Sequence, residues 1–278
     1  MKFSAAFSKF MFYFGNIVIG IIFVSPLIWM ISASLKPESQ IFANMNSLKT
    51  FFPVSASFNN YVEVFTRMNL PQVFKNTLLY IALILVLDLL VNSMCGYALA
   101  KFEFKGKGAI MNLVVALMVL PMEAIMLPLY IEMSQLGWVN TLAALVIPFV
   151  AKCFSIYMFR QFFCDIPDDL INAAKIDGCG RLRIFFKVVF PMVKSSIIAL
   201  SIFTFVGAWN NFLWPMVSCS KQEMKTLPLA LSMMKTLYNT DVGLTMACAV
   251  INFLPPFIFY VFMQSKFKEG MTLSGIKG

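Results

Sequence analysis

The stretch FCDIPDDLINAAKIDG, residues 163–178, carries the clearest local signal in this chain. Asp165 can cap a helix, and Pro167 with the two acidic residues after it suits a first helical turn. Lys175 fits the last turn, and Gly178 can take the left-handed conformation that ends a helix. The stretch therefore predicts a short helix at a membrane surface. On these residues alone, the helix could equally well lie on lipid or dock on a protein.

The composition around this stretch is that of a membrane protein. Of the 278 residues, 60% are hydrophobic and 13% are charged, whereas a soluble domain of this length carries more charge. A helix needs about 20 mostly apolar residues to cross a bilayer. Six stretches meet that requirement, at residues 11–33, 77–100, 108–130, 141–159, 195–218 and 242–264. The sequence predicts a single all-α membrane domain over residues 1–278, with six transmembrane helices.

The basic residues predict which side of the membrane each loop faces. With the N-terminus inside, fourteen Lys and Arg residues fall in cytoplasmic segments and seven in outer segments. Cytoplasmic loops carry the excess of such residues. We therefore expect a multi-pass protein of the cell membrane with both termini in the cytoplasm. Residues 160–194 form the only sizeable cytoplasmic loop in this scheme.

Several function classes are disfavoured by the composition. The chain has no histidine, which removes the commonest general base and the commonest zinc ligand. Its six cysteines form no close pair, so neither a metal site nor a disulfide framework is expected. The net charge of +9 is scattered between apolar runs, which suits membrane topology better than nucleic-acid binding. The sequence thus predicts no catalytic residue, no metal and no nucleic-acid partner.

The cytoplasmic loop resembles the EAA loop of ABC importer permeases. That pattern is Glu-Ala-Ala, two residues, Asp-Gly, and about a dozen residues to a hydrophobic residue and Pro. The residues that match, and that the resemblance assigns to coupling with an ATPase, are Asn172, Ala173, Ala174, Asp177, Gly178 and Pro191. Asn172 replaces the family's glutamate. We therefore expect hydrogen bonding at this position in place of an ion pair.

Matches elsewhere narrow the resemblance to carbohydrate-uptake permeases. The chain is similar to the second, shorter permease of maltose- and glycerol-phosphate-type systems. The segments that carry this likeness include Ser34–Pro37, Tyr97–Phe102, Trp209–Phe212 and Leu227–Leu229. The resemblance implies the type I ABC importer permease fold. It leaves the sugar unnamed, with a di- or oligosaccharide preferred and glycerol-phosphate still open.

The resemblance also implies partners. They are a homologous permease, two cytoplasmic ABC ATPase subunits and an extracellular sugar-binding protein, in a bacterial or archaeal membrane. The chain lacks a Gly-x-x-x-x-Gly-Lys-Ser/Thr loop, so ATP and Mg²⁺ are expected on the ATPase and no cofactor is expected on this chain. The permease is therefore not expected to be an enzyme.

Polar residues in the predicted fifth span are candidates for a sugar pathway. Ser201, Thr204 and Asn211 recur at helical spacing, and such residues inside a membrane are costly and often functional. Trp209 offers a face for sugar stacking, and Asn210 a further hydrogen-bonding group. The alternative is that this stripe packs against the other permease, since small residues let helices approach closely.

Two opposite charges fall near the middle of neighbouring predicted spans. Asp88 and Lys152 lie at similar depth, and opposite charges there can offset each other's cost. We therefore expect an intramembrane ion pair that acts as a structural clamp. Each could instead face a watery cavity or the partner permease. Together with Glu123 they also leave open an ion-coupled carrier or channel that works without an ATPase.

Overall fold

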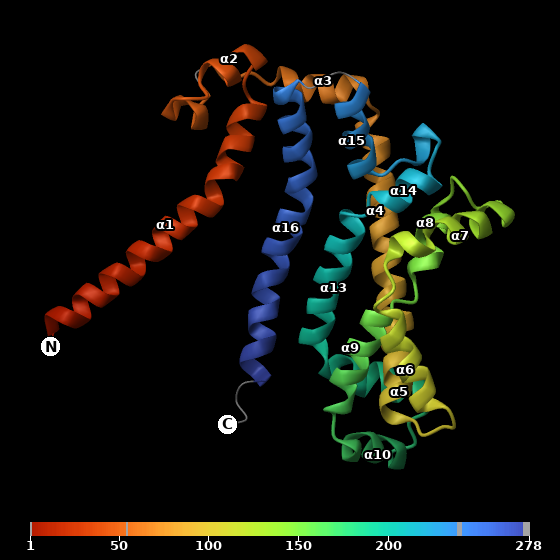
Figure 1. Ribbon diagram of the computed structural model, residues 1–278. Coiled ribbons are helices and arrows are strands. Elements are labelled where there is room, and N and C mark those ends of the chain that lie inside the picture. The colour runs from red at the N-terminus through yellow and green to blue at the C-terminus, as the bar shows by residue number, and fades with distance from the viewer. Residues whose placement is uncertain (1, 54, 238–240, 275–278) are drawn as a thin grey trace. The chain divides into compact units, whose positions relative to one another are not determined.

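A computed structural model describes residues 2–53, 55–237 and 241–274, and the side chains of 8–53, 55–234 and 241–264. Its described elements are all helical. Contacts group the chain into two units, one formed by Met1–Leu70 with Ala230–Pro255 and the other by Pro71–Leu229 with Pro256–Gly278. Figure 1 shows the helices coloured from red at the N-terminus to blue at the C-terminus.

The first unit begins with the long apolar helix α1 (Lys2–Ser34). It is followed by α2 (Glu38–Ala43), the 3₁₀ turn η1 (Leu48–Phe51) and α3 (Asn59–Arg67). The helices α15 (Leu227–Leu237) and α16 (Val242–Ser274) each place part of their length in this unit. The segment Ser8–Ser34 of α1 and the segment Val242–Gln264 of α16 are each long and apolar enough to span a membrane.

Buried polar contacts hold the loops of the first unit. The Lys36 ammonium donates to the carbonyls of Lys49 at 2.8 Å and Thr50 at 2.9 Å, and burial lowers the pKa of Lys36. The Asn60 amide donates to the carbonyls of Ser34 and Lys36 at 2.9 and 3.0 Å. These contacts tie α3 and η1 to the end of α1.

The second unit is built around one 32-residue helical segment, Leu70–Lys101. It consists of α4 (Leu70–Leu87), a π-helical turn η2 (Asp88–Asn92) and α5 (Ser93–Lys101). Helix α9 (Cys153–Cys164) packs against α5. A Cβ atom at Gly96 would come within 2.6 Å of the Phe159 Cβ and 2.8 Å of the Arg160 nitrogen. Only glycine allows this close approach.

Two of the predicted spans, 108–130 and 141–159, are bent rather than continuous. Helix α6 (Lys107–Leu117) meets α7 (Met122–Gln135) at 104°. The segment Leu142–Phe149, made of α8 (Leu142–Val146) and η3 (Ile147–Phe149), meets α9 at 45°. Pro121 lies at the first bend, and Pro148 lies inside η3, two residues before the break at 150–152; each proline lacks a backbone donor. The described residues hold three uninterrupted apolar helices, and up to six spans if each bent pair crosses once.

The predicted span 195–218 was wrong in its boundaries. Helix α13 covers Lys194–Trp209, and α14 (Leu213–Ser218) starts after a break. The segment Arg181–Met192, composed of α11 (Arg181–Ile184), the π-helical turn η4 (Phe185–Val189) and α12 (Phe190–Met192), meets α13 at 82°. After α14, the short 3₁₀ turn η5 (Gln222–Met224) leads into α15.

Candidate functional site

The predicted loop helix is present as α10 (Asp168–Ile176). Two acidic residues occupy its first turn and Lys175 its last, as the sequence predicts. Gly178 follows with φ +75°, the left-handed stop. The predicted cap was wrong: Pro167 precedes the helix, and Asp165 instead ends α9. Figure 1 shows α10 as a short helix set at the end of α9.

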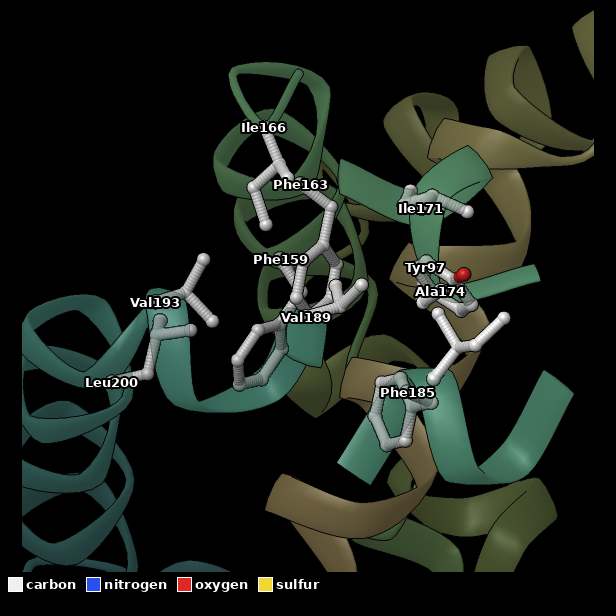
Figure 2. Close-up of a cluster of buried hydrophobic side chains, with 11 residues drawn as sticks. Tyr97, Phe159, Phe163, Ile166, Ile171, Ala174, Phe185, Val189, Val193 and Leu200 are labelled. Carbon is white, nitrogen blue, oxygen red and sulfur yellow. The ribbon is translucent and has the colours of Figure 1, made fainter. Parts of the chain in front are cut away.

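The inner face of α10 belongs to the core of this unit. Ile171 and Ala174 are buried in a cluster with aromatic side chains that include Tyr97, Phe163 and Phe185, as Figure 2 shows. Ala174 is only 8% exposed. The methyl group of Ala174 therefore packs against its own chain, and a contact of this residue with an ATPase stays a prediction.

The outer face of α10 presents polar and apolar side chains together. Asn172, Ala173 and Asp177 are exposed, and the side-chain oxygen Oδ1 of Asn172 accepts a hydrogen bond from the Lys175 ammonium at 3.2 Å. Ile176 is 87% exposed. Sequence reasoning missed it, although an apolar residue at the last helical position, three residues after the exposed Ala173, is a recognisable sign of an apolar contact surface.

The remaining residues that match the EAA pattern, Gly178 and Pro191, are also accessible. Gly178 is exposed, and a Cβ atom there would meet nothing within 4 Å. Pro191 is exposed on α12. Leu170 within α10 and Leu182 on α11 add exposed apolar surface. The loop thus exposes a surface about as long as one short helix, and the buried aromatic cluster lies beneath it.

Charged contacts join the loop to the end of α5. The Lys101 ammonium donates to the Asp168 carboxylate at 2.7 Å and to the Ile166 carbonyl at 2.6 Å. The hydrogen bond and charge of Lys101 lower the pKa of Asp168, so this carboxylate is ionised at neutral pH. The Arg181 guanidinium lies 5.3 Å from the centre of the Phe102 ring.

The predicted intramembrane ion pair is replaced by a hydrogen-bonded network. Asp88 is fully buried, and its two oxygens accept from Thr204 Oγ1 and Asn92 Nδ2, each at 2.6 Å. The side-chain oxygen Oδ1 of Asn92 in turn accepts from the backbone N–H of Lys152 at 3.1 Å. Among the described residues, the ion pairs do not include Asp88 with Lys152.

Two polar contacts join α4–η2 to α13 and the residues after it. Besides Asp88 with Thr204, the Asn211 amide donates to the Tyr80 hydroxyl at 3.2 Å. Tyr80 and Asp88 lie about two turns apart, as do Asn211 and Thr204, in antiparallel order. The predicted polar stripe therefore packs inside this chain, and neither a pathway nor the partner permease is needed to explain Thr204 and Asn211.

The other candidate pathway residues have different surroundings. The Ser201 hydroxyl donates to the Ile197 carbonyl one turn earlier at 2.7 Å. Trp209 is fully buried and stacks on Phe205, with ring centres 5.8 Å apart. Asn210 is exposed. Of the five predicted pathway residues, Asn210 therefore has the most accessible side chain, and Trp209 offers no open face to a sugar.

Solved structures support the fold assignment. A chain in a crystal structure of a bacterial ABC transporter involved in the import of the acidic polysaccharide alginate superposes with a TM-score of 0.81 and 23% identity. The match covers 94% of this chain and 98% of that chain. It confirms the predicted fold class, an all-α polytopic membrane protein with the type I ABC importer permease fold.

Sequence comparisons cover nearly the whole chain. The arabinooligosaccharides transport system permease protein AraQ of Halalkalibacterium halodurans is 36% identical over 265 residues, 95% of each protein. The lactose transport system permease protein LacG of Rhizobium radiobacter is 31% identical over 248 residues, 89% of each. A family model described as a binding-protein-dependent transport system inner membrane component matches residues 92–272. Since that match spans more than half of the chain, this protein belongs to the binding-protein-dependent transport system inner membrane component family.

Proposed function

We propose that this chain is a permease subunit of an ATP-driven sugar importer. The observation that carries the proposal is α10, a short helix with a buried inner face and an accessible outer face in a chain of this family. A helix whose inner face already packs on its own chain leaves its outer residues for another protein. An ATPase is the partner that such a transporter requires.

The assembly follows from the same assignment. A homologous permease would complete the pathway, two cytoplasmic ABC ATPase subunits would bind ATP and Mg²⁺, and an extracellular binding protein would deliver the sugar. This chain would hold no cofactor. The excess of basic residues around α10 supports a cytoplasmic position for the loop and for both termini. Its location would be a bacterial or archaeal cell membrane, in contact with lipid.

An oligosaccharide is the substrate class that the relatives favour. The names of two relatives specify arabinooligosaccharides and lactose. Exposed Asn210 is the residue of this chain that we expect nearest the sugar, because an amide can both donate and accept hydrogen bonds to hydroxyls. Ser201 is the second candidate, while Thr204, Trp209 and Asn211 would act through packing.

An ion-coupled carrier finds less support. Such a carrier needs a charged group that ions can reach. Asp88 is fully buried and both of its oxygens already accept hydrogen bonds. Its surroundings suit a structural contact between helices.

The experiment compares two substitutions of exposed apolar residues with aspartate. Ile176→Asp changes the outer face of α10, and Leu48→Asp is the matched control on η1, where the side chain is exposed to a similar extent. Each tagged permease is purified from its native membrane in mild detergent, and the co-purified ATPase is quantified. We expect Ile176→Asp to lose most of the ATPase while Leu48→Asp retains it. Equal retention by both variants would remove α10 as the docking element.

A further inference from the structure

We propose that Lys101 is the positioning residue of α10: it fixes the orientation of this helix relative to the Leu70–Lys101 segment, so that movement of α10 is passed to that segment. The inference deepens the proposed function and rests on it. Lys101 lies outside the EAA-like pattern, at the last position of α5.

The contacts of Lys101 surround the start of α10. Its ammonium donates to the carbonyl of Ile166 and to the carboxylate of Asp168, the residues on either side of Pro167. Proline has no backbone N–H, so the segment between α9 and α10 can make one fewer backbone hydrogen bond. The ammonium supplies a directional contact at the point where the chain turns from α9 into α10.

The apolar contacts of α10 do not by themselves fix the orientation of this helix. Ile171 and Ala174 sit on a cluster that includes the Tyr97 ring, which lies 5.7 Å from the ring of Phe163 and 5.3 Å from that of Phe185. Apolar burial is non-directional, so it keeps α10 on the cluster but leaves rotation about the contact weakly restrained. Hydrogen bonds to a charged donor depend on angle as well as distance.

A second contact holds the other flank of α10. Phe102, the neighbour of Lys101, lies under the guanidinium of Arg181, which begins α11. The end of α5 therefore contacts the chain both before and after α10. Since α5 continues from η2 and α4 without interruption, a displacement of α10 held in this way moves the end of the Leu70–Lys101 segment.

The two contacts of Lys101 differ in their surroundings. The Lys101 side chain is 9% exposed, whereas that of Asp168 is 72% exposed. Water and salt screen an exposed ion pair, which contributes little by itself. The bond to the Ile166 carbonyl is therefore expected to carry most of the effect. Removing the lysine should be far more harmful than neutralising Asp168.

The test uses the complete transporter in proteoliposomes, with the sugar of its binding protein as substrate. The variants are Lys101→Met, Lys101→Arg and Asp168→Asn. Lys107→Met is the matched control, because Lys107 also forms an ion pair in this region, with Glu103 at 2.9 Å, and does not contact α10 among the described residues. Two quantities are measured: sugar transported per ATP hydrolysed, and amide hydrogen exchange of residues 165–178.

We expect Lys101→Met to lower the transport ratio and to speed exchange of α10 by roughly tenfold, the factor implied by losing one charge-assisted hydrogen bond. Lys101→Arg, Asp168→Asn and Lys107→Met should stay within about twofold of the unmodified complex, because arginine keeps the charge and the donors and the other two changes spare the Ile166 contact. The apparent affinity for the binding protein should not change in any variant.

Wild-type ratios and exchange rates in Lys101→Met would overturn the proposal. If that variant fails to assemble, Lys101→Gln, which keeps a neutral donor, is measured in its place, and an unchanged ratio would again contradict it. An unmodified complex without ATP-dependent uptake would instead refute the proposed function. The exchange of residues 165–178 would still decide whether Lys101 positions α10.

Discussion

Replacing Thr204 with valine should destabilise the membrane bundle more than replacing Lys152 with methionine. Valine has nearly the shape of threonine but no hydroxyl. Thr204→Val therefore removes the donor to one oxygen of Asp88 while filling the same space. Asp88 is fully buried, so water does not replace the lost partner.

The magnitude follows from what is left behind. An average hydrogen bond between membrane helices contributes about 0.6 kcal/mol, whereas a buried acceptor deprived of its donor costs about 1–3 kcal/mol, and more if it is charged. We expect Thr204→Val to lower the unfolding free energy by about 1–3 kcal/mol or slightly more, because it leaves a buried acceptor without its donor. Asp88→Asn should cost less than that, since an amide can still pair with both Thr204 and Asn92.

The assay is unfolding of the purified permease in mixed micelles by increasing amounts of SDS, followed by tryptophan fluorescence. Thr66→Val is the matched control, because the Thr66 hydroxyl donates to the backbone carbonyl of Glu63 on an exposed helix surface, and the substitution should change the unfolding free energy by less than about 0.5 kcal/mol. Lys152→Met should behave like this control. A loss for Lys152→Met as large as for Thr204→Val, relieved by adding Asp88→Asn, would refute the network and restore the ion pair.

Three further changes test the loops. Gly178→Val should lower uptake while the protein still inserts, because a β-branched residue at φ +75° costs about 1–3 kcal/mol; Gly178→Asn should be milder, and equal uptake by both would contradict the requirement for a left-handed residue. Asn172→Glu should keep uptake within about twofold, since a carboxylate three residues before Lys175 adds a weak favourable pair; complete loss of uptake would show a partner adapted to the amide. Lys36→Met should speed proteolysis after Lys49, because the carbonyls of Lys49 and Thr50 each lose a charge-assisted hydrogen bond worth about 1.5–3 kcal/mol and keep only a neutral donor; an unchanged cleavage rate would show that η1 does not depend on Lys36.

Local signals predicted α10 well because they act over a few residues. The acidic first turn, Lys175 and the left-handed Gly178 each depend only on the neighbouring backbone. The burial of Ala174 could not be predicted, because it depends on which side of the helix meets Tyr97, Phe163 and Phe185, and these come from three other elements, α5, α9 and η4. Periodicity shows that a helix has two faces, but it does not show which face the rest of the chain covers.

The membrane residues show the same limit. Counting residues along a span gives the depth of a residue in the membrane, and by that count Asp88 and Lys152 lie at a similar depth. Hydrogen bonding depends on rotation about the helix axis as well, and the structure turns Asp88 toward Thr204. The contact with Asn92, four residues later, could have been predicted from helical spacing alone. The break before α14 could not, since Asn210 and Asn211 give only a weak turn signal.

The most direct test of the central claim is transport by the reconstituted complex of this permease, its partner permease, the ATPase and the binding protein. Sugar uptake into proteoliposomes is measured with ATP inside, with and without ionophores that collapse ion gradients. The account predicts uptake that requires ATP and the binding protein and that persists with the ionophores. Uptake driven by an ion gradient without ATP or the ATPase would contradict it.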